Sequence, residues 1–80
     1  MPDNDVYVFL KLQKLRADKG LRKSELARLS NVAVNTLNAA EKRVGNKLET
    51  LMRIFNVLNS TGYYDGTLSP DELIIPKKLS

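Results

Sequence analysis

Apolar residues recur at helical spacing in several stretches of the chain, and glycines, prolines and short polar turns separate these stretches. The strongest pattern covers 47–58, where five apolar side chains share one face of a helix: Leu48, Leu51, Ile54, Phe55 and Leu58. A face of this kind is typical of a helix that packs against a core. We therefore expect this helix to support the fold, with its aliphatic residues, Leu48 included, buried in the core.

The N-terminal part of the chain allows two interpretations. Residues 5–19 contain no glycine or proline, and three apolar residues at three-residue spacing favour a helix that Gly20 would end: Phe9, Leu12 and Leu15. Three polar residues are candidates to cap its first turn: Asp3, Asn4 and Asp5. The β-branched and aromatic residues at 6–9 favour a short strand instead, which could pair with a second copy of the chain.

Shorter helices are expected on both sides of the strongest one. One covers 23–29 and the next covers 34–42, with a turn at Ser30–Asn31 between them. Their apolar residues are few and mostly small or aliphatic: Leu26, Ala27, Leu29, Leu37 and Ala40. Ser69 and Pro70 are typical of a helix start and predict a brief fifth helix, which Pro76 would end.

The chain contains no cysteine and no histidine. Disulfides, thiol nucleophiles, zinc fingers and Ser-His-Asp triads are therefore excluded by composition. No glycine-rich phosphate loop is present, and the carboxylates near 65–72 stand where they would serve as caps. We expect no enzymatic activity, no cofactor and no bound metal. No apolar run approaches the roughly 18 residues of a membrane helix, and the acidic first residues are atypical of a signal peptide, so we expect a cytoplasmic protein.

The net charge of +4 is unevenly distributed. Residues 21–47 carry six basic and two acidic side chains, whereas residues 48–80 carry three basic and four acidic ones. A basic excess gathered in one part of a small domain is typical of a surface that meets an anionic partner. The candidates for contacts with DNA phosphates are Arg22, Lys23, Arg28, Lys42, Arg43 and Lys47.

The segment 25–38 has the pattern of a short helix, a tight turn and a second short helix. In it, the small Ala27 allows the two helices to approach closely, and Val32 lies beneath the turn. This segment resembles the helix-turn-helix domains of the phage Cro and repressor type, also called the Xre family. The stretch 12–21 looks like that family's first helix and its exit, and 48–54 looks like its fourth helix.

The resemblance implies an all-α, Cro/repressor-like fold of four to five helices over residues 1–62, with a short C-terminal extension over 63–80. In such a fold the helix at 34–42 would enter the major groove of double-stranded DNA. An ion pair between the first and third helices is frequent in the family, and Arg16 and Glu41 stand at the matching positions. The function implied is that of a sequence-specific transcriptional regulator, acting as a dimeric repressor.

The sequence departs from the family pattern along this reading helix. Ala33 replaces the usual Ser or Thr cap of this helix, and Lys23 replaces a Gln at the start of the helix before it. Asn31 stands in the turn where Gly is frequent, and it can replace Gly because Asn tolerates a left-handed backbone. The candidate base contacts that remain are Val34, Asn35, Thr36 and Asn38. Because asparagine can bind adenine through two hydrogen bonds and valine can contact the thymine methyl group, we expect a preference for A·T pairs.

The C-terminal extension is open to two interpretations. Its apolar and aromatic residues either fold back on the domain or contact a second copy or a protein partner: Tyr63, Tyr64, Leu73, Ile74 and Ile75. A homodimer would bind two half-sites one DNA turn apart. Two alternative functions stay open, namely an antitoxin that binds a toxin and regulates its own operon, and a protein-binding adaptor whose helix-turn-helix no longer reads DNA.

Overall fold

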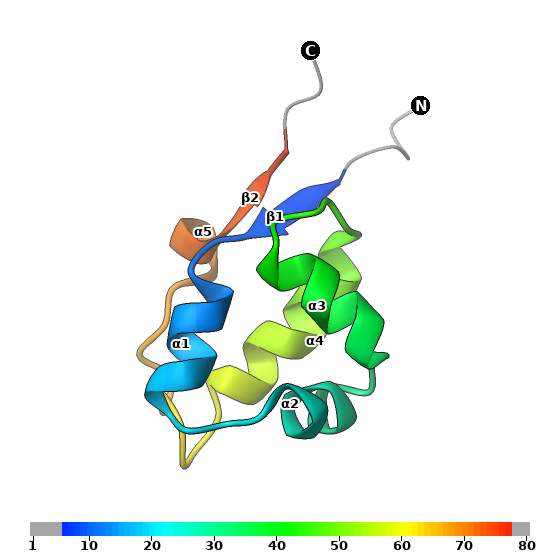
Figure 1. The fold of residues 1–80 in the computed structure, drawn as a ribbon. Coiled ribbons are helices and arrows are strands. Elements are labelled where there is room, and N and C mark those ends of the chain that lie inside the picture. Colours follow the sequence, from blue (N-terminus) through cyan, green and yellow to red (C-terminus); the bar gives the residue numbers. More distant parts are fainter. Residues whose placement is uncertain (1–5, 78–80) are drawn as a thin grey trace.

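The computed structural model describes residues 6–77, which form five short helices and a two-stranded sheet (Figure 1). The helices and strands follow one another along the chain as β1 (Tyr7–Phe9), α1 (Leu12–Asp18), α2 (Lys23–Ser30), α3 (Val34–Glu41), α4 (Leu48–Leu58), α5 (Pro70–Leu73) and β2 (Ile74–Pro76). The fold is mostly helical, as expected. None of the helices within residues 6–77 has the length and apolar character needed to cross a bilayer.

The first element is a strand, so the second interpretation of the N-terminal segment is confirmed. The side chains at 7–9 are aromatic or β-branched and suit a half-buried strand better than the first turns of a helix. The helix begins only at Leu12, after Lys11 in a left-handed conformation (φ 61°). The expected caps at 3–5 lie outside the described residues, and the N-cap position of α1 is occupied by Lys11. Gly20 ends the helix as predicted, with φ +66° and its N–H bound to the Ala17 carbonyl.

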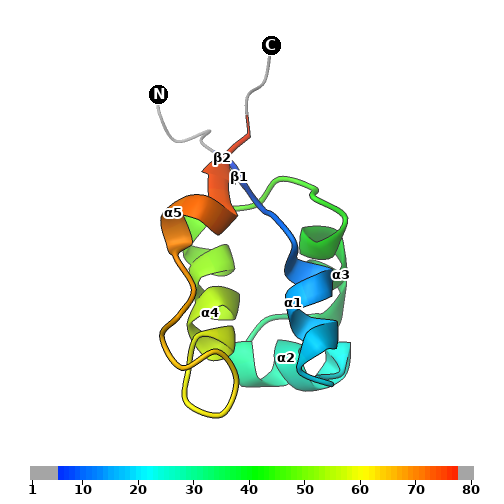
Figure 2. The same ribbon diagram turned by 90° about the vertical axis from the view of Figure 1, so that its left-hand side faces the viewer.

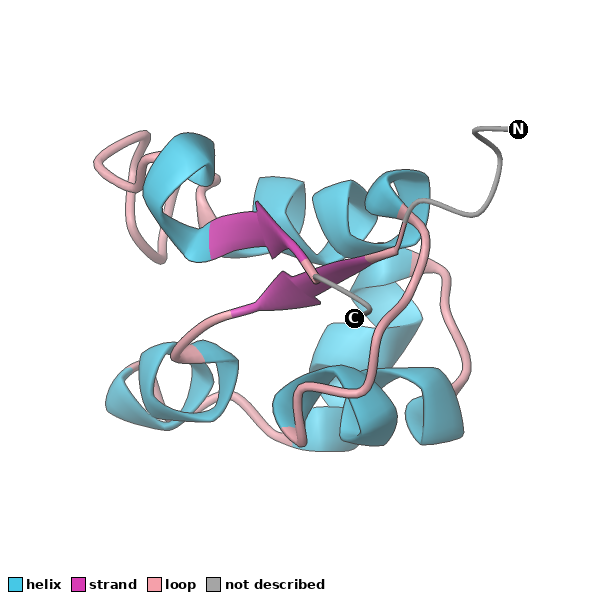
Figure 3. Cartoon of the chain, turned by 90° about the horizontal axis from the view of Figure 1, so that it is seen from above, coloured by secondary structure: helices cyan, strands magenta, loops and turns pink. Residues whose placement is uncertain are grey.

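The sheet joins the two ends of the described chain (Figure 3). β1 and β2 are antiparallel, with Tyr7 opposite Pro76 and Phe9 opposite Ile74. The other edge of β1 meets the α3–α4 loop, because the N–H and C=O groups of Tyr7 both bond to Asn46, at 2.8 and 2.9 Å. The pairing of β1 is thus made within one chain. The predicted fifth helix exists but ends at Leu73, three residues before Pro76, because the chain extends into β2.

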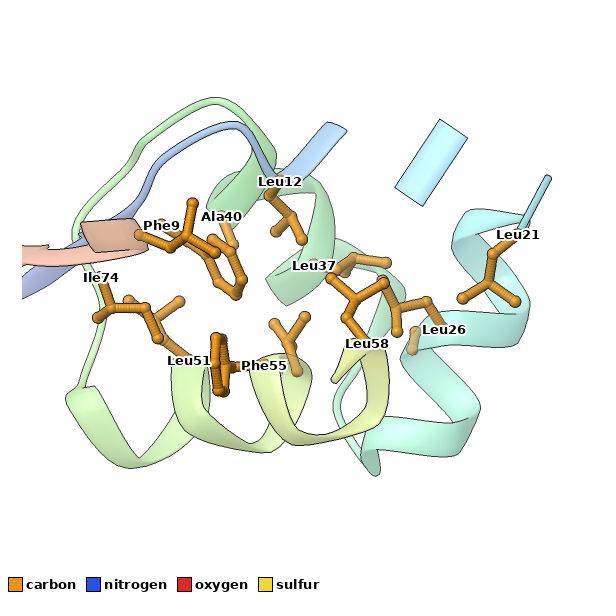
Figure 4. Close-up of a cluster of buried hydrophobic side chains, with 13 residues drawn as sticks. Phe9, Leu12, Leu21, Leu26, Leu37, Ala40, Leu51, Phe55, Leu58 and Ile74 are labelled. Carbon is orange, nitrogen blue, oxygen red and sulfur yellow. The ribbon is translucent and has the colours of Figure 1, made fainter. Parts of the chain in front are cut away.

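The core lies between the helices and reaches the sheet (Figure 4). Four residues of α4 are buried, namely Leu51, Ile54, Phe55 and Leu58, and they contact apolar residues of the other elements. At the sheet end, the rings of Phe9 and Phe55 lie 6.3 Å apart in a tilted arrangement.

One leucine expected to be buried, Leu48, is exposed instead, and Leu29 of α2 is exposed as well. Leu48 is 41% exposed because it is the first residue of α4 and lies at the edge of a groove beside β2. Leu29 is 46% exposed because the buried face of α2 is centred on Leu26, Ala27 and Ser30, and Leu29 falls outside it. A short helix with one narrow buried face therefore cannot bury every apolar residue it contains.

The segment after α4 folds back along α4 toward α5 (Figure 2). The Asn59 side chain accepts a hydrogen bond from the Leu68 N–H at 2.9 Å, which closes the intervening loop. The Tyr64 hydroxyl donates to the Leu15 carbonyl at 2.8 Å, and the Lys19 ammonium lies 4.5 Å from the centre of the Tyr64 ring. These contacts attach the extension to the first helix of the domain.

Candidate nucleic-acid interface

The helices α2 and α3 are joined by a tight turn that brings them into close contact. Asn31 ends α2 in a left-handed conformation (φ 59°), as predicted for a residue that replaces glycine. The Val32 N–H bonds to the Ala27 carbonyl at 3.0 Å, and the Val32 side chain packs against the core beneath the turn. The arrangement of helix, turn and helix is therefore that of a helix-turn-helix unit.

The α3 helix presents one polar face outward and one apolar face inward. Leu37 and Ala40 are completely buried, whereas Val34 is 46% exposed and Asn35 is exposed. Ala33 occupies the N-cap position with an extended backbone and supplies no side-chain hydrogen bond, as its methyl group requires. The outward face is thus free to approach a ligand.

The remaining predicted base contacts lie nearer to the body of the domain. Thr36 and Asn38 are half-buried, and Ala39 lies beside them with intermediate exposure. The side chain of Asn38 is engaged within the protein, because its Oδ1 accepts a hydrogen bond from the Lys23 Nζ at 2.9 Å. Asn35 and Asn38, which the sequence offered as equivalent base contacts, are therefore in different environments.

A buried ion pair fixes α3 against α1. The Glu41 side chain is only 3% exposed and receives the Arg16 guanidinium through Nε and Nη2. Arg16 also donates from Nη1 to the Leu21 carbonyl at 2.8 Å, in the segment that leads to α2. The predicted ion pair is confirmed. One guanidinium holds α1, α3 and the segment before α2 in a fixed relation, because its planar donors point in set directions.

Most of the residues predicted to contact phosphates are exposed, and they lie before, within or after the helix-turn-helix unit in the sequence. Arg22 precedes α2, Arg28 lies in its last turn, and the other three follow α3 or precede α4: Lys42, Arg43 and Lys47. Within residues 6–77 none of these five forms an ion pair. Basic side chains without a carboxylate partner are available to bind an external anion.

The family model of the Cro/C1-type HTH DNA-binding domain matches residues 11–61. The chain belongs to this family. The match covers α1 to α4, which is the part that holds the helix-turn-helix unit and the Arg16–Glu41 pair. No curated protein and no solved structure matches the chain.

The Cro/C1-type domain carries additional structure outside the matched residues. Here, β1, α5 and β2 form an apolar groove of about 540 Å³ with the first half of α4. Its lining includes Leu48 and Ile75, which are both partly exposed, and the Met52 side chain. The acidic Asp71 lies at its edge. The lining of this groove is mostly apolar and carries one charged residue, Asp71, in contrast to the basic residues before and after α3 in the chain.

The residues predicted to contact a dimer partner are distributed unevenly between core and surface. Leu73 and Ile74 belong to the core of the Cro/C1-type domain, and Tyr63 and Tyr64 are half-buried against it. Ile75 alone of the five is exposed, at 36%. Sequence reasoning missed Leu48 as a surface residue, because helical spacing shows which face a residue shares but not where the neighbouring elements end.

Sequence reasoning also missed the role of Lys23 within the domain. Its ammonium was expected to contact phosphate, yet it lies 2.9 Å from Asn38 Oδ1 and 3.8 Å from Glu41 Oε1. The three residues are separated by up to 18 positions in the sequence, so no local pattern links them. The only signal in the sequence is a lysine at the first position of a helix, where the helix dipole disfavours positive charge.

Proposed function

We propose that this Cro/C1-type domain is a sequence-specific regulator of transcription that binds double-stranded DNA as a homodimer and represses by covering a promoter. The observation that carries the proposal is an exposed α3 surface held by the buried Arg16–Glu41 pair and flanked in the chain by exposed basic side chains that form no ion pair within residues 6–77. Rigid placement matters because base recognition depends on hydrogen bonds, and a mobile helix would not keep their distances and angles.

In this proposal α3 lies in the major groove with Val34, Asn35 and Asn38 toward the base edges and the half-buried Thr36 beside them. The exposed basic residues before, after and within the helix-turn-helix unit bind the phosphates on either side. These contacts would fix the register of the domain on DNA, while the α3 side chains supply the sequence preference.

The binding proposal is tested by fluorescence anisotropy on two labelled duplexes over a series of salt concentrations. One duplex carries the DNA immediately upstream of the coding region, and the other is a scrambled version of it. We expect tight binding to the first duplex, weak binding to the second, and a salt slope of about −0.9 per phosphate contacted. Lack of binding to either duplex at low salt would contradict the proposal and favour the protein-binding adaptor.

Dimerisation is proposed because a single helix-turn-helix unit reads only one half-site. The α3 helix of one chain has 8 residues and is about 12 Å long, whereas successive major grooves on one side of DNA are about 34 Å apart. One copy therefore fills one groove, and a second copy is needed to fill the next. The groove beside β2 supports self-association, since Leu48 and Ile75 offer apolar surface there.

The dimer is tested by light scattering and by equilibrium sedimentation over a range of concentrations. We expect a mass near twice 9.0 kDa for the wild type. Ile75→Asp should shift the mass toward the monomer and weaken binding to the upstream duplex, because one half-site then binds alone. Leu29→Asp is the matched control for the mass measurement, since Leu29 is similarly exposed but lies on α2, away from the groove. A wild-type protein that stays monomeric on DNA would contradict the dimer.

A further inference from the structure

Lys23 stands where the local chemistry of a helix disfavours it. It is the first residue of α2, and the N-terminus of a helix carries partial positive charge. The preceding Arg22 adds a second cation at the same end. A residue that breaks a local preference is usually retained by a tertiary contact or by function. The contacts of its ammonium group with α3 supply the tertiary reason.

Two side chains of α3 bind the ammonium group of Lys23. Its Nζ lies 2.9 Å from Asn38 Oδ1 and 3.8 Å from Glu41 Oε1. Glu41 cannot move toward solvent easily, because it is 3% exposed and bound to Arg16. The side chain of Lys23 keeps 42% exposure, so it reaches the carboxylate from the surface of the domain. The result is a chain of contacts from α1 through Glu41 to Lys23 and Asn38.

This contact determines which atoms Asn38 presents. An ammonium group has only donors, so the Asn38 amide must turn its Oδ1 oxygen toward Lys23. The Nδ2 group, with its two N–H donors, is then directed away from Lys23, and within residues 6–77 it makes no hydrogen bond. A held amide of this kind offers donors and reads an acceptor, such as guanine N7 and O6 or thymine O4.

The Asn35 amide is under no such restraint. Its side chain is exposed and makes no hydrogen bond within residues 6–77. It can offer its oxygen and its N–H groups together, which is the combination that binds the N6 and N7 atoms of adenine. The two asparagines of α3 are thus chemically distinct, although they are the same residue type on the same helix.

We infer that Lys23 is a positioning residue for base recognition and not a phosphate contact: it fixes the Asn38 amide so that α3 presents an N–H donor at that point of the major groove. The inference rests on the proposed function, because it assigns a specificity to the same helix. It also changes the expected preference, since the Asn35 amide makes no hydrogen bond within residues 6–77 and is better suited than Asn38 to a paired contact with adenine.

The test uses a duplex that the wild-type protein itself selects from a random library. Affinity for this duplex, and for each single-base variant of it, is measured over a salt series for the wild type, Lys23→Met, Asn38→Ala and the double variant. Arg22→Met is the matched control, because Arg22 is the neighbouring residue, is exposed and forms no ion pair in residues 6–77.

We expect Lys23→Met and Asn38→Ala to relax the preference at the same base pair, each by about tenfold. The double variant should lose no more than Asn38→Ala alone, because the two side chains act as one unit. The salt slope should stay close to that of the wild type for Lys23→Met and fall in size by about 0.9 for Arg22→Met. Lys23→Arg, which keeps a donor and the charge, should restore much of the preference.

Three results would overturn the inference. A salt slope that falls by about 0.9 in Lys23→Met, with equal losses on all sequences, would make Lys23 a phosphate contact and leave the proposed function intact. Additive effects in the double variant would show that Lys23 and Asn38 act independently. A wild-type protein that selects no sequence would overturn the proposed function and this inference with it.

A measurement on the unmodified protein covers the case in which the variants fold poorly. The lysine ammonium groups of the ¹⁵N-labelled wild type are observed by NMR in the absence of DNA. Exchange with water should be slower at Lys23 than at the exposed Lys42 and Lys47, because hydrogen-bonded ammonium protons are protected. Equal exchange at the three sites would contradict the contact on which the inference depends.

Discussion

The α2–α3 half of the molecule and the half formed by β1, β2 and α5 are held together by different forces. The buried apolar residues of α2 and α3 are Leu26, Ala27, Leu37 and Ala40, and a buried ion pair between Arg16 and Glu41 adds a charged contact that fixes α3 in place. The opposite half depends on apolar burial and strand pairing, with Phe9, Leu73 and Ile74 in the core. A helix whose outer face stays polar to meet DNA buries apolar area on its inner face alone, so directional charged contacts add to that burial in fixing its geometry.

The comparison predicts the largest loss of stability at the buried ion pair. Arg16→Ala removes the main partner of the nearly buried Glu41, so the free energy of unfolding should fall by about 3–5 kcal/mol. Lys14→Ala, on the same helix, breaks only an exposed pair with Asp18 and should cost less than about 1 kcal/mol. Urea titration followed by circular dichroism measures both values. Equal losses would show that the ion pair is not what fixes α3.

The apolar half is tested by two neighbouring residues of one strand. Ile74→Ala removes a core side chain and should lower the free energy of unfolding by about 2–4 kcal/mol. Ile75→Ala affects the exposed face of the same strand and should stay within about 0.5 kcal/mol of the wild type. Thermal unfolding is measured at a protein concentration low enough to keep the chain monomeric, which separates these effects on stability from dimerisation. A small effect of Ile74→Ala would mean that β2 contributes little to the fold.

The DNA-facing half should respond to mutation in binding more than in stability. Asn35→Ala should weaken binding to the selected duplex by about 1–3 kcal/mol and leave random DNA unaffected, since its exposed side chain has no structural partner in residues 6–77. Lys47→Ala should weaken binding to both duplexes by a similar factor, because a phosphate contact is blind to sequence. Anisotropy titrations compare the two. A loss for Asn35→Ala that is equal on both duplexes would remove it from base recognition.

The smallest predicted effect concerns the tyrosine that joins the extension to α1. Burial, and then the nearby negative charge of Asp18, raise the pKa of Tyr64 above its usual value of 10.0. The folded state therefore favours the neutral phenol, which also donates to the Leu15 carbonyl. Its stabilising effect is fully present below about pH 10 and is lost as the pH rises above that value.

Tyr64→Phe isolates this effect from the titration of the lysines. At neutral pH it should cost about 1 kcal/mol, the usual net contribution of one hydrogen bond. The difference in unfolding free energy between wild type and variant should then shrink as the pH rises through and above 10. A difference that stays constant up to pH 11 would show that the hydroxyl is not held as the geometry indicates.

The sequence by itself determined the helices and the helix-turn-helix unit. Helices α2, α3 and α4 begin and end within one or two residues of the expected positions, because apolar spacing, Gly20 and Asn31 are local signals. The absence of cysteine and histidine excluded whole classes of chemistry without any structure. The ion pair between Arg16 and Glu41 was available only through the family resemblance, since 25 positions separate the two residues.

The tertiary structure alone decided the features that depend on distant partners. The strand β2 pairs with β1, which lies near the other end of the sequence. A segment as short as β2 forms a strand only when such a partner is present. The same holds for the exposure of Leu48 and Leu29, which follows from where other elements end. In the sequence, Lys23 and Asn38 are polar residues of two separate predicted helices, and nothing there indicates that they are in contact. Only the packing of α2 against α3 joins them, and this contact makes Asn38 different from Asn35.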